Sequence, residues 1–214
     1  MFIEVLDGTD AGLKAVYRFG QNGDRVTVRT SSRAKNFFGR LLGRLSVDPR
    51  SSEAMRNQHH PITTMSLSNL VAVILRDVQK AFARGEDSIV FVEPDVLHGR
   101  ETLIVSITSP ALDGESHRVS QGETLWDIAE DRGQDMYVMR HHNRDVLDPN
   151  KVRAGHMVFV PHCYAFRTFV WGFPATGLIQ QVQIYDWNNE LYEMFIFENL
   201  RINIELGDDA FDVG

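Results

Sequence analysis

The sequence predicts an α+β fold, and three observations support this prediction. Runs of aromatic and β-branched residues occur on both sides of one amphipathic helix at 66–82. A separate segment at 117–161 has instead the pattern of a strand, two helices and a strand. The 214 residues are 43% hydrophobic and 24% charged, which is typical of a globular protein with a sizeable core. The chain length fits either one ordinary domain or a larger domain with a small one set into it.

The first 30 residues predict short strands separated by turns. Asp7-Gly8 and Asn22-Gly23 are turn dipeptides, and residues 26–30 alternate apolar and polar side chains. A basic, less regular segment follows these strands, runs through Arg44 and ends in Val47-Asp48-Pro49. The stretch Arg25–Arg44 is locally positive, and no helix or strand is predicted after residue 30 in it.

One helix is predicted in the first half, at Ser66–Phe82. Its apolar residues recur at steps of three and four, and Arg84-Gly85 follows as a stop signal. The apolar stripe consists of Leu67, Leu70, Val71, Ile74, Leu75, Val78 and Phe82. Strands are predicted next at 88–92 and 102–108.

A polar stretch at 109–115 predicts a boundary, and the strand pattern returns after residue 161. Four further strands are predicted at 166–171, 178–185, 190–197 and 200–205, with a hairpin turn at Asn188-Asn189. The acidic tail at 207–214 is expected to be loose coil apart from Phe211.

The segment between these strands begins with a short strand and the turn residue Gly122. Thr124-Leu-Trp-Asp127 has the spacing of a capping box, in which a hydroxyl and a carboxylate satisfy free amides at a helix start. Leu125 contributes to one apolar helix face, and Gly133 ends the helix. The pattern predicts a first helix of about two turns.

A second helix is predicted from its N-cap, Asp135, to about Asn143. A loop through Asp148-Pro149-Asn150 then leads to Gly155 and to a final strand at 157–160, closed by Pro161. The segment is therefore a βααβ unit.

These residues closely resemble the LysM family. The matching positions, in family order, are Val119, Gly122-Glu123-Thr124-Leu125-Trp126, Ile128-Ala129, Gly133, Met139, Asn143, Gly155 and Val158-Phe159-Val160-Pro161. Two places depart from the family pattern: His141-His142, and Val152-Arg153-Ala154.

The resemblance implies a shallow groove for a glycan that contains N-acetylglucosamine, such as peptidoglycan or a chitin-like polymer. Each hydrogen bond to a sugar contributes only about 0.5–1.5 kcal/mol, so a single module is expected to bind weakly. An alternative is that the module serves for structural or protein contacts. The implied glycan-binding residues are Gly122, Glu123, Thr124 and Leu125 from one loop, and Asp148, Pro149, Asn150, Lys151 and Val152 from another.

The flanking segments resemble a bacterial envelope family of unknown function that is related to the lipoprotein carrier LolA. The similar stretches are Leu45–Pro49, Ala54–Ile62, Val182–Glu193, Asn199–Asn203 and Asp209–Asp212. The resemblance implies a discontinuous domain at 1–110 and 164–214, with the LysM domain at 117–161 inserted. It also implies an incomplete antiparallel β-barrel packed on a helix.

A concave apolar face of such a barrel would hold a lipid or a lipoprotein acyl chain. The alternative is a filled core, and composition does not separate the two. The residues expected on this face are Leu67, Leu70, Ile74, Phe91, Ile104, Phe169, Ile184 and Phe195.

Charge and composition limit the partners and the location. The formal net charge of -7 argues against nucleic acid as a partner, and no stretch has the length of a transmembrane helix. The single cysteine, Cys163, allows no intramolecular disulfide. The first residues lack the pattern of a signal peptide. We expect a periplasmic or cell-envelope protein, with a cytoplasmic location as the alternative.

No catalytic, metal or cofactor pattern is found in the sequence. The adjacent histidines of His59-His60 and of His141-His142 point apart on a regular element, so neither pair predicts a metal site. Cys163 is expected to be a small buried thiol. Glu123 and Asp127 are expected to belong to a turn and a helix cap rather than to a glycosidase pair.

The function that we predict is therefore non-enzymatic glycan binding in the cell envelope, without a cofactor. The main alternative is a structural or assembly protein, cytoplasmic or phage-derived, that uses LysM for protein contacts. A third candidate is a cell-wall hydrolase with a LysM anchor, which would need a catalytic domain that the flanks do not offer.

Overall fold

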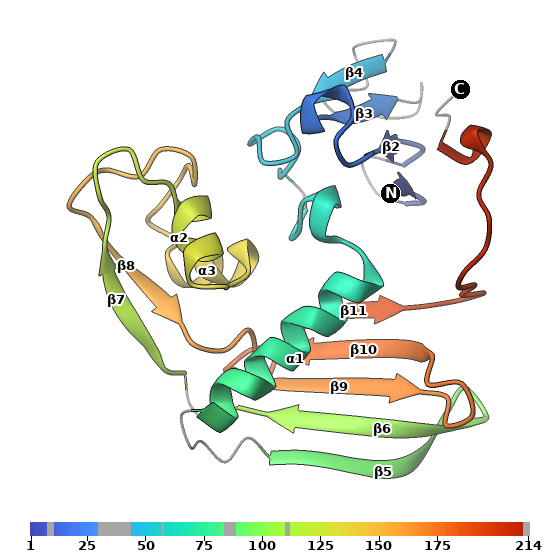
Figure 1. Cartoon of the computed structure of the whole chain (residues 1–214). Coiled ribbons are helices and arrows are strands. Elements are labelled where there is room, and N and C mark those ends of the chain that lie inside the picture. The colour runs from blue at the N-terminus through green and yellow to red at the C-terminus, as the bar shows by residue number, and fades with distance from the viewer. Residues whose placement is uncertain (8–10, 30–43, 57, 84–88, 110–111, 212–214) are drawn as a thin grey trace. The chain divides into compact units, whose positions relative to one another are not determined.

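The computed structural model describes residues 1–7, 11–29, 44–56, 58–83, 89–109 and 112–211 (Figure 1). The chain forms two compact units: unit 1 contains Met1–Leu70 and Ile204–Gly214, and unit 2 contains Val71–Asn203. The prediction had one discontinuous domain at 1–110 and 164–214 and a second domain at 117–161. The two units of the structure divide the chain at other positions. The α+β class is confirmed, with mostly antiparallel sheets and few helices.

Unit 1 is built on a four-stranded antiparallel sheet in the order β1–β2–β3–β4. Its strands are β1 (Phe2–Glu4), β2 (Lys14–Val16), β3 (Val26–Arg29) and β4 (Arg44–Val47). Strand β4 was not predicted, because the charged residues around it hide its alternation.

The position of β4 is explained by its partners across the sheet. Leu45 and Val47 lie opposite Val28 and Val26, so the short strand completes an apolar face that no local pattern reveals. Residues 30–43, which include most of the segment predicted to be less regular, and Gly8 of the Asp7-Gly8 turn lie outside the described residues.

Among the described residues of unit 1, three short 3-10 helical turns accompany this sheet. The predicted turn at Asn22-Gly23 is present as η1 (Asn22–Asp24), whose three residues all have left-handed φ angles of 54°, 61° and 56°. The second turn is η3 (Ile62–Thr64), and Ile62 joins a small core with Ala15, Val26 and Val28. The third, η4 (Asp208–Phe211), replaces the loose coil that was predicted for the tail.

The predicted helix is confirmed as α1 (Leu67–Ala83). It begins where the Ser66 hydroxyl accepts a hydrogen bond from the Asn69 amide, at 3.1 Å. Its apolar stripe is wider than its buried face, because Leu75 and Phe82 are 55% and 63% exposed.

Unit 2 contains a five-stranded antiparallel sheet in the order β11–β10–β9–β6–β5. Five of the six strands predicted after the helix are confirmed, with shifted ends. They are β5 (Ile89–Leu97), β6 (Arg100–Thr108), β9 (Arg167–Gly172), β10 (Ile179–Tyr185) and β11 (Leu191–Ile196).

Strand β5 is longer than the prediction, and the turn that follows explains this. His98 and Gly99 both have left-handed φ angles, 51° and 76°, which fit a tight hairpin. The hairpin keeps β5 paired with β6 from Ile89 opposite Thr108 to Leu97 opposite Arg100.

The predicted strand at 200–205 is wrong. The backbone turns left-handed at Asn199 and Asn203, where φ is 53° and 56°, and no strand forms between them. The apolar residues that suggested a strand remain exposed: Ile202 by 60% and Ile204 by 52%.

The residues predicted to line one concave face do not share a surface. The register places Ile104 opposite Trp171, and Phe169 opposite Ser106 and Gln183, on one face of the sheet. Ile184 and Phe195 lie on the other face, because side chains alternate along each strand. The strands of the described residues form no closed barrel.

The predicted βααβ arrangement is confirmed within unit 2 (Figure 1). It consists of β7 (Gly114–Arg118), α2 (Leu125–Asp131), α3 (Met136–His142) and β8 (Met157–Pro161), and we call it the βααβ unit. Strands β7 and β8 pair antiparallel from Gly114 opposite Pro161. Strand β7 therefore starts inside the stretch that was predicted as a polar boundary.

Candidate functional site

The start of α2 has the predicted capping box. The Thr124 hydroxyl accepts a hydrogen bond from the Asp127 amide at 3.1 Å, and the Asp127 carboxylate accepts one from the Thr124 amide at 2.8 Å. These two bonds satisfy amides that a helix start leaves free. They fix the loop that precedes α2.

The two loops predicted to form the glycan groove lie side by side. The Leu125 amide donates a hydrogen bond to the Pro149 carbonyl at 2.9 Å, which ties the first loop to the second. The second loop is itself a turn, in which the Lys151 amide donates to the Asp148 carbonyl at 2.9 Å. The Asp148 carboxylate also accepts from the Asn150 amide at 3.0 Å.

Two of the predicted glycan-binding side chains have other roles. Leu125 is 0% exposed and belongs to the core of the βααβ unit. The Glu123 carboxylate accepts from the Ser120 amide at 2.7 Å and lies 3.0 Å from Nε2 of His117. The hydrogen bond from His117, followed by that from Ser120, lowers the pKa of Glu123. Glu123 therefore holds its loop together.

The remaining predicted residues reach the surface. Gly122, Asn150 and Lys151 are exposed, and the side chain of Lys151 is 83% exposed. The half-buried members are Thr124, Asp148, Pro149 and Val152. The two loops therefore present polar groups together with the half-buried apolar side chains of Pro149 and Val152.

The sequence analysis missed one neighbouring residue, Leu147. Its side chain is 90% exposed immediately before the second loop. An exposed leucine beside hydrogen-bonding groups adds an apolar surface to the candidate site. A single exposed apolar residue is common in proteins, so the sequence alone gave no signal for it.

A rigid core supports both loops. The most buried side chains of the βααβ unit include Val119, Ile128 and Met139, each at most 2% exposed. Asn143 joins α3 to β8: its amide donates to the carbonyls of Met139 and Phe159 at 2.7 and 2.8 Å. Its side-chain oxygen accepts from the Phe159 amide at 2.8 Å. The family-like asparagine is therefore a structural clamp.

One face of α3 packs on the turn and strand around β10 and β11. The rings of Tyr137 and Tyr192 lie 4.8 Å apart, and His141 lies 5.1 Å from Tyr192. His142 lies 5.3 Å from Trp187. The two histidines that depart from the LysM pattern thus form this contact.

The ring of His142 is held neutral by its surroundings. Burial is the largest cause, followed by the positive charges of His141 and Arg144, and together they lower the pKa of His142 to about 4. Within the described part of the chain, its buried Nε2 has no hydrogen-bond partner, and neither does the buried indole nitrogen of Trp187.

Tyr164 connects the βααβ unit to the rest of unit 2. Its amide donates to the Asp77 carboxylate on α1, and its hydroxyl donates to the Glu193 carboxylate on β11 at 2.6 Å. Burial, and then the charge of Glu193, raise the pKa of Tyr164. Lys80 of α1 adds a hydrogen bond from its ammonium to the Arg132 carbonyl at 2.9 Å. No local pattern predicts these contacts, because they join residues far apart in the sequence.

The residues considered for metal binding or catalysis have structural surroundings. Cys163 is 4% exposed, as predicted, and the neighbouring His162 lies 3.2 Å from the Asp113 carboxylate. Among the residues that the structure describes, no three histidine, cysteine, aspartate or glutamate side chains are grouped to hold a metal. None of the described helices combines the length and apolarity needed to span a membrane.

These features define an α+β protein with a small βααβ unit fixed to a larger antiparallel sheet. Residues 2–145, more than half of the chain, match a family model described as a protein of unknown function (DUF1571), and the chain belongs to this family. No curated protein matches the chain, and no solved structure does.

Proposed function

We propose that the βααβ unit is a LysM module that binds a glycan containing N-acetylglucosamine, most directly peptidoglycan, without enzymatic activity. The observation that carries this proposal is the hydrogen bond between the Leu125 amide and the Pro149 carbonyl. It brings together the two loops that the LysM resemblance names as the groove. The family-like residues Thr124 and Asn143 have structural contacts that explain their types.

The ligand suits the groups at this surface. The amide of Asn150 and nearby backbone groups match N-acetyl and hydroxyl groups, while Leu147 and Pro149 offer apolar contacts to the sugar ring. A millimolar dissociation constant corresponds to roughly -4 kcal/mol, which is a reasonable value for one shallow module. Binding to a polymer gains from its many repeated sites.

Co-sedimentation with purified sacculi tests this proposal. The wild-type chain should sediment with sacculi, and chitin oligomers should release it. A variant with Asn150→Gly, Lys151→Ser and Val152→Gly keeps the Asp148-Pro149 turn but alters the surface, and we expect at least about a fivefold loss of the bound fraction, the scale set by losing one hydrogen bond.

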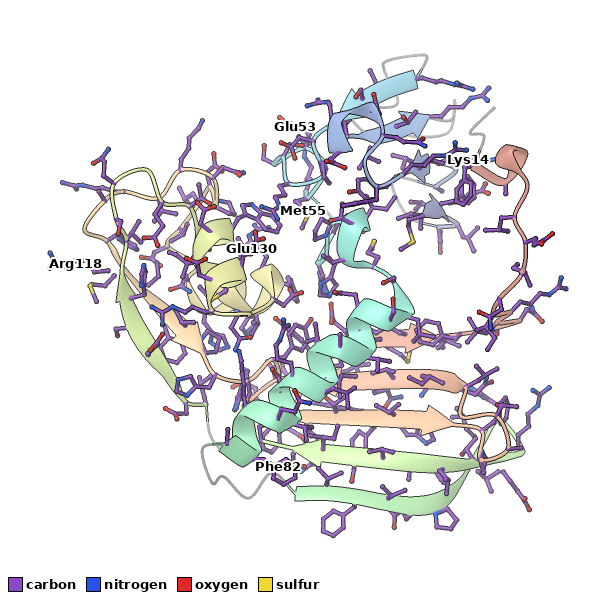
Figure 2. The ribbon with its side chains drawn as sticks, viewed as in Figure 1. Lys14, Glu53, Met55, Phe82, Arg118 and Glu130 are labelled. Carbon is purple, nitrogen blue, oxygen red and sulfur yellow. The ribbon has the colours of Figure 1, made fainter. Side chains whose placement is uncertain are left out.

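Glu130→Gln is the control, because Glu130 is exposed near the C-terminal end of α2 and belongs to neither loop (Figure 2). It should sediment like the wild type, and thermal melting should show that both variants fold. Equal sedimentation of the loop variant and the wild type would contradict glycan binding by these two loops.

A second candidate function concerns unit 1, where an apolar hollow of about 150 Å³ lies on the inner face of the sheet. A cavity of this size accommodates about one benzene-sized group. We propose that it takes a short segment of a lipid or lipoprotein acyl chain, as the LolA resemblance suggests. Its walls include Leu13, Ala15, Val26, Val28, Val47 and Ile62, and its polar residues include Glu53 and Arg56.

The rival proposal is a structural or assembly protein that uses the βααβ unit for protein contacts. The packing of α3 against Tyr192 and Trp187 favours it, since one face of the unit already makes a protein contact. Failure to bind sacculi would support this rival. Fractionation of cells that produce the natural gene product would separate a periplasmic or envelope location from a cytoplasmic one.

A further inference from the structure

A row of positive charges crosses the sheet of unit 1. The register places Lys14 opposite Arg29, and Arg29 opposite Arg44, so three adjacent strands carry cations in line. Like charges directly opposite each other destabilise a sheet. Glu4 lies 3.9 Å from Lys14. The row is a local concentration of cations in a chain of net charge -7, and such a concentration attracts anions.

The row lies on the face of the sheet that is opposite to the apolar core. Side chains alternate along each strand, and Ala15 and Val28 occupy the core side. Lys14 therefore projects from the other side (Figure 2).

On the same face, a polar hollow of about 160 Å³ is lined by three arginines. Arg44 belongs both to the row and to the hollow, while Arg18 and Arg25 come from the segment between β2 and β3. Among its described lining residues there is no carboxylate, and Gln21, Asn22 and Thr27 supply neutral hydrogen-bonding groups.

Two of the guanidinium groups are held in place by the protein. Arg25 donates to the hydroxyl and the carbonyl of Ser46, at 3.0 and 2.9 Å. The guanidinium of Arg18 stacks 5.0 Å from the centre of the Phe211 ring. The nearby Asp24 carboxylate accepts a hydrogen bond from the Gly20 amide at 2.9 Å. The cations are thus preorganised.

We propose that this hollow binds a phosphate-type oxyanion, supplied either as free phosphate or as a phospholipid headgroup. Guanidinium groups present forked donors that match phosphate oxygens, and three of them converge here with neutral donors beside them. This site lies in unit 1 and is independent of the proposed glycan binding in unit 2.

Equilibrium binding of inorganic phosphate, at constant ionic strength with chloride as the replaced anion, tests the chemistry. The full chain should bind phosphate, and Arg44→Gln and Arg18→Gln should each weaken binding about tenfold or more, the scale for removing one charged hydrogen-bond partner. Arg118→Gln, an exposed residue of β7, makes the same change of charge outside the hollow and should bind like the wild type. Thermal melting checks that the variants fold.

Vesicles separate the two sources of the phosphate group. Binding to phosphatidylglycerol vesicles but not to phosphatidylcholine vesicles, with inorganic phosphate as a competitor, assigns the hollow to a lipid headgroup. Phosphate binding without vesicle binding assigns it to free phosphate. The proposal is overturned if phosphate binds no better than chloride, or if Arg118→Gln weakens binding as much as Arg44→Gln does.

Discussion

Thr124 shows how a single side chain positions the candidate groove. Its hydroxyl caps α2, and its amide is bound by Asp127, so both ends of the capping box depend on this residue. The next amide along the chain, that of Leu125, reaches the second loop. Because Thr124 and Leu125 are neighbours in the sequence, the helix cap and the contact between the two loops form one local structure.

Replacing this cap should destabilise the protein. We expect Thr124→Ala to lower the free energy of unfolding by about 1 kcal/mol, the usual value for losing a threonine N-cap. Thr124→Ser retains the hydroxyl and should lose much less. Denaturant unfolding measures both changes. An alanine variant as stable as the serine variant would show that the cap contributes nothing here.

At the scale of elements, α3 connects the βααβ unit to the region around β10 and β11. The contact contains two histidines, and the pKa of His142 is lowered to about 4 mainly by burial. Charged groups face it from both sides: His141 and Arg144 from its own segment, and Asp186 from the hairpin. The neutral ring is therefore favoured in the folded protein.

This contact should weaken in acid. Because the pKa of His142 is lower in the folded protein than the ordinary value of 6.5, the unfolded chain binds more protons between these values. The contribution of the neutral His142 ring to the free energy of unfolding is fully present above pH 6.5. It is lost as the pH falls towards 4. After allowance for solvent screening, we expect a loss of about 1–2 kcal/mol.

His142→Phe keeps an aromatic ring beside Trp187 but removes the titration. Its free energy of unfolding should fall less than that of the wild type between pH 7 and pH 4.5, as measured by denaturant unfolding. His59→Phe, at an exposed position, should retain the wild-type dependence on pH. The account of this contact fails if the two variants respond to acid alike.

At the scale of the whole molecule, each unit contains its own candidate binding feature. Unit 2 has the two adjoining loops of the βααβ unit. Unit 1 has the apolar hollow on one face of its sheet and, on the other face, the polar hollow lined by three arginines. The apolar hollow of about 150 Å³ opens to solvent. An apolar group that enters it would remove apolar wall surface from water, which is favourable.

Filling the apolar hollow tests this account of unit 1. Ala15 is buried and lines the hollow, so Ala15→Leu should reduce the fluorescence gained by an apolar dye such as N-phenylnaphthylamine, without loss of folding. Ala83→Leu makes the same change at an exposed position on α1 and should behave like the wild type. Unchanged dye binding by Ala15→Leu would contradict an accessible hollow.

Local patterns predicted the parts of this fold that depend on neighbours in the sequence. The helix α1, the capping box at Thr124 and the stop at Gly133 follow from residues within one or two turns. Strand register was not predictable in this way. Strand β4 and the face on which Phe169 lies are decided by pairing with distant strands.

Glycan binding at the candidate site stays a prediction, while the structure gives the surroundings of its residues. The two loops are adjacent, as the resemblance implied, but Leu125 is buried and Glu123 is bonded within its own loop. Of the three arginines that line the polar hollow of unit 1, Arg25 and Arg44 belong to the stretch described as locally positive, and Arg18 lies outside it. Their convergence depends on the turn at Asn22 and on the pairing of β3 with β4.

The measurement that tests the central claim most directly is a titration of the isotopically labelled chain with a chitin tetramer, followed by amide chemical shifts. Saturable shifts at residues 122–125 and 148–152, with a dissociation constant near the millimolar range, are the result that the account predicts. An absence of shifts at millimolar ligand, or shifts confined to residues elsewhere in the chain, would contradict glycan binding by the βααβ unit.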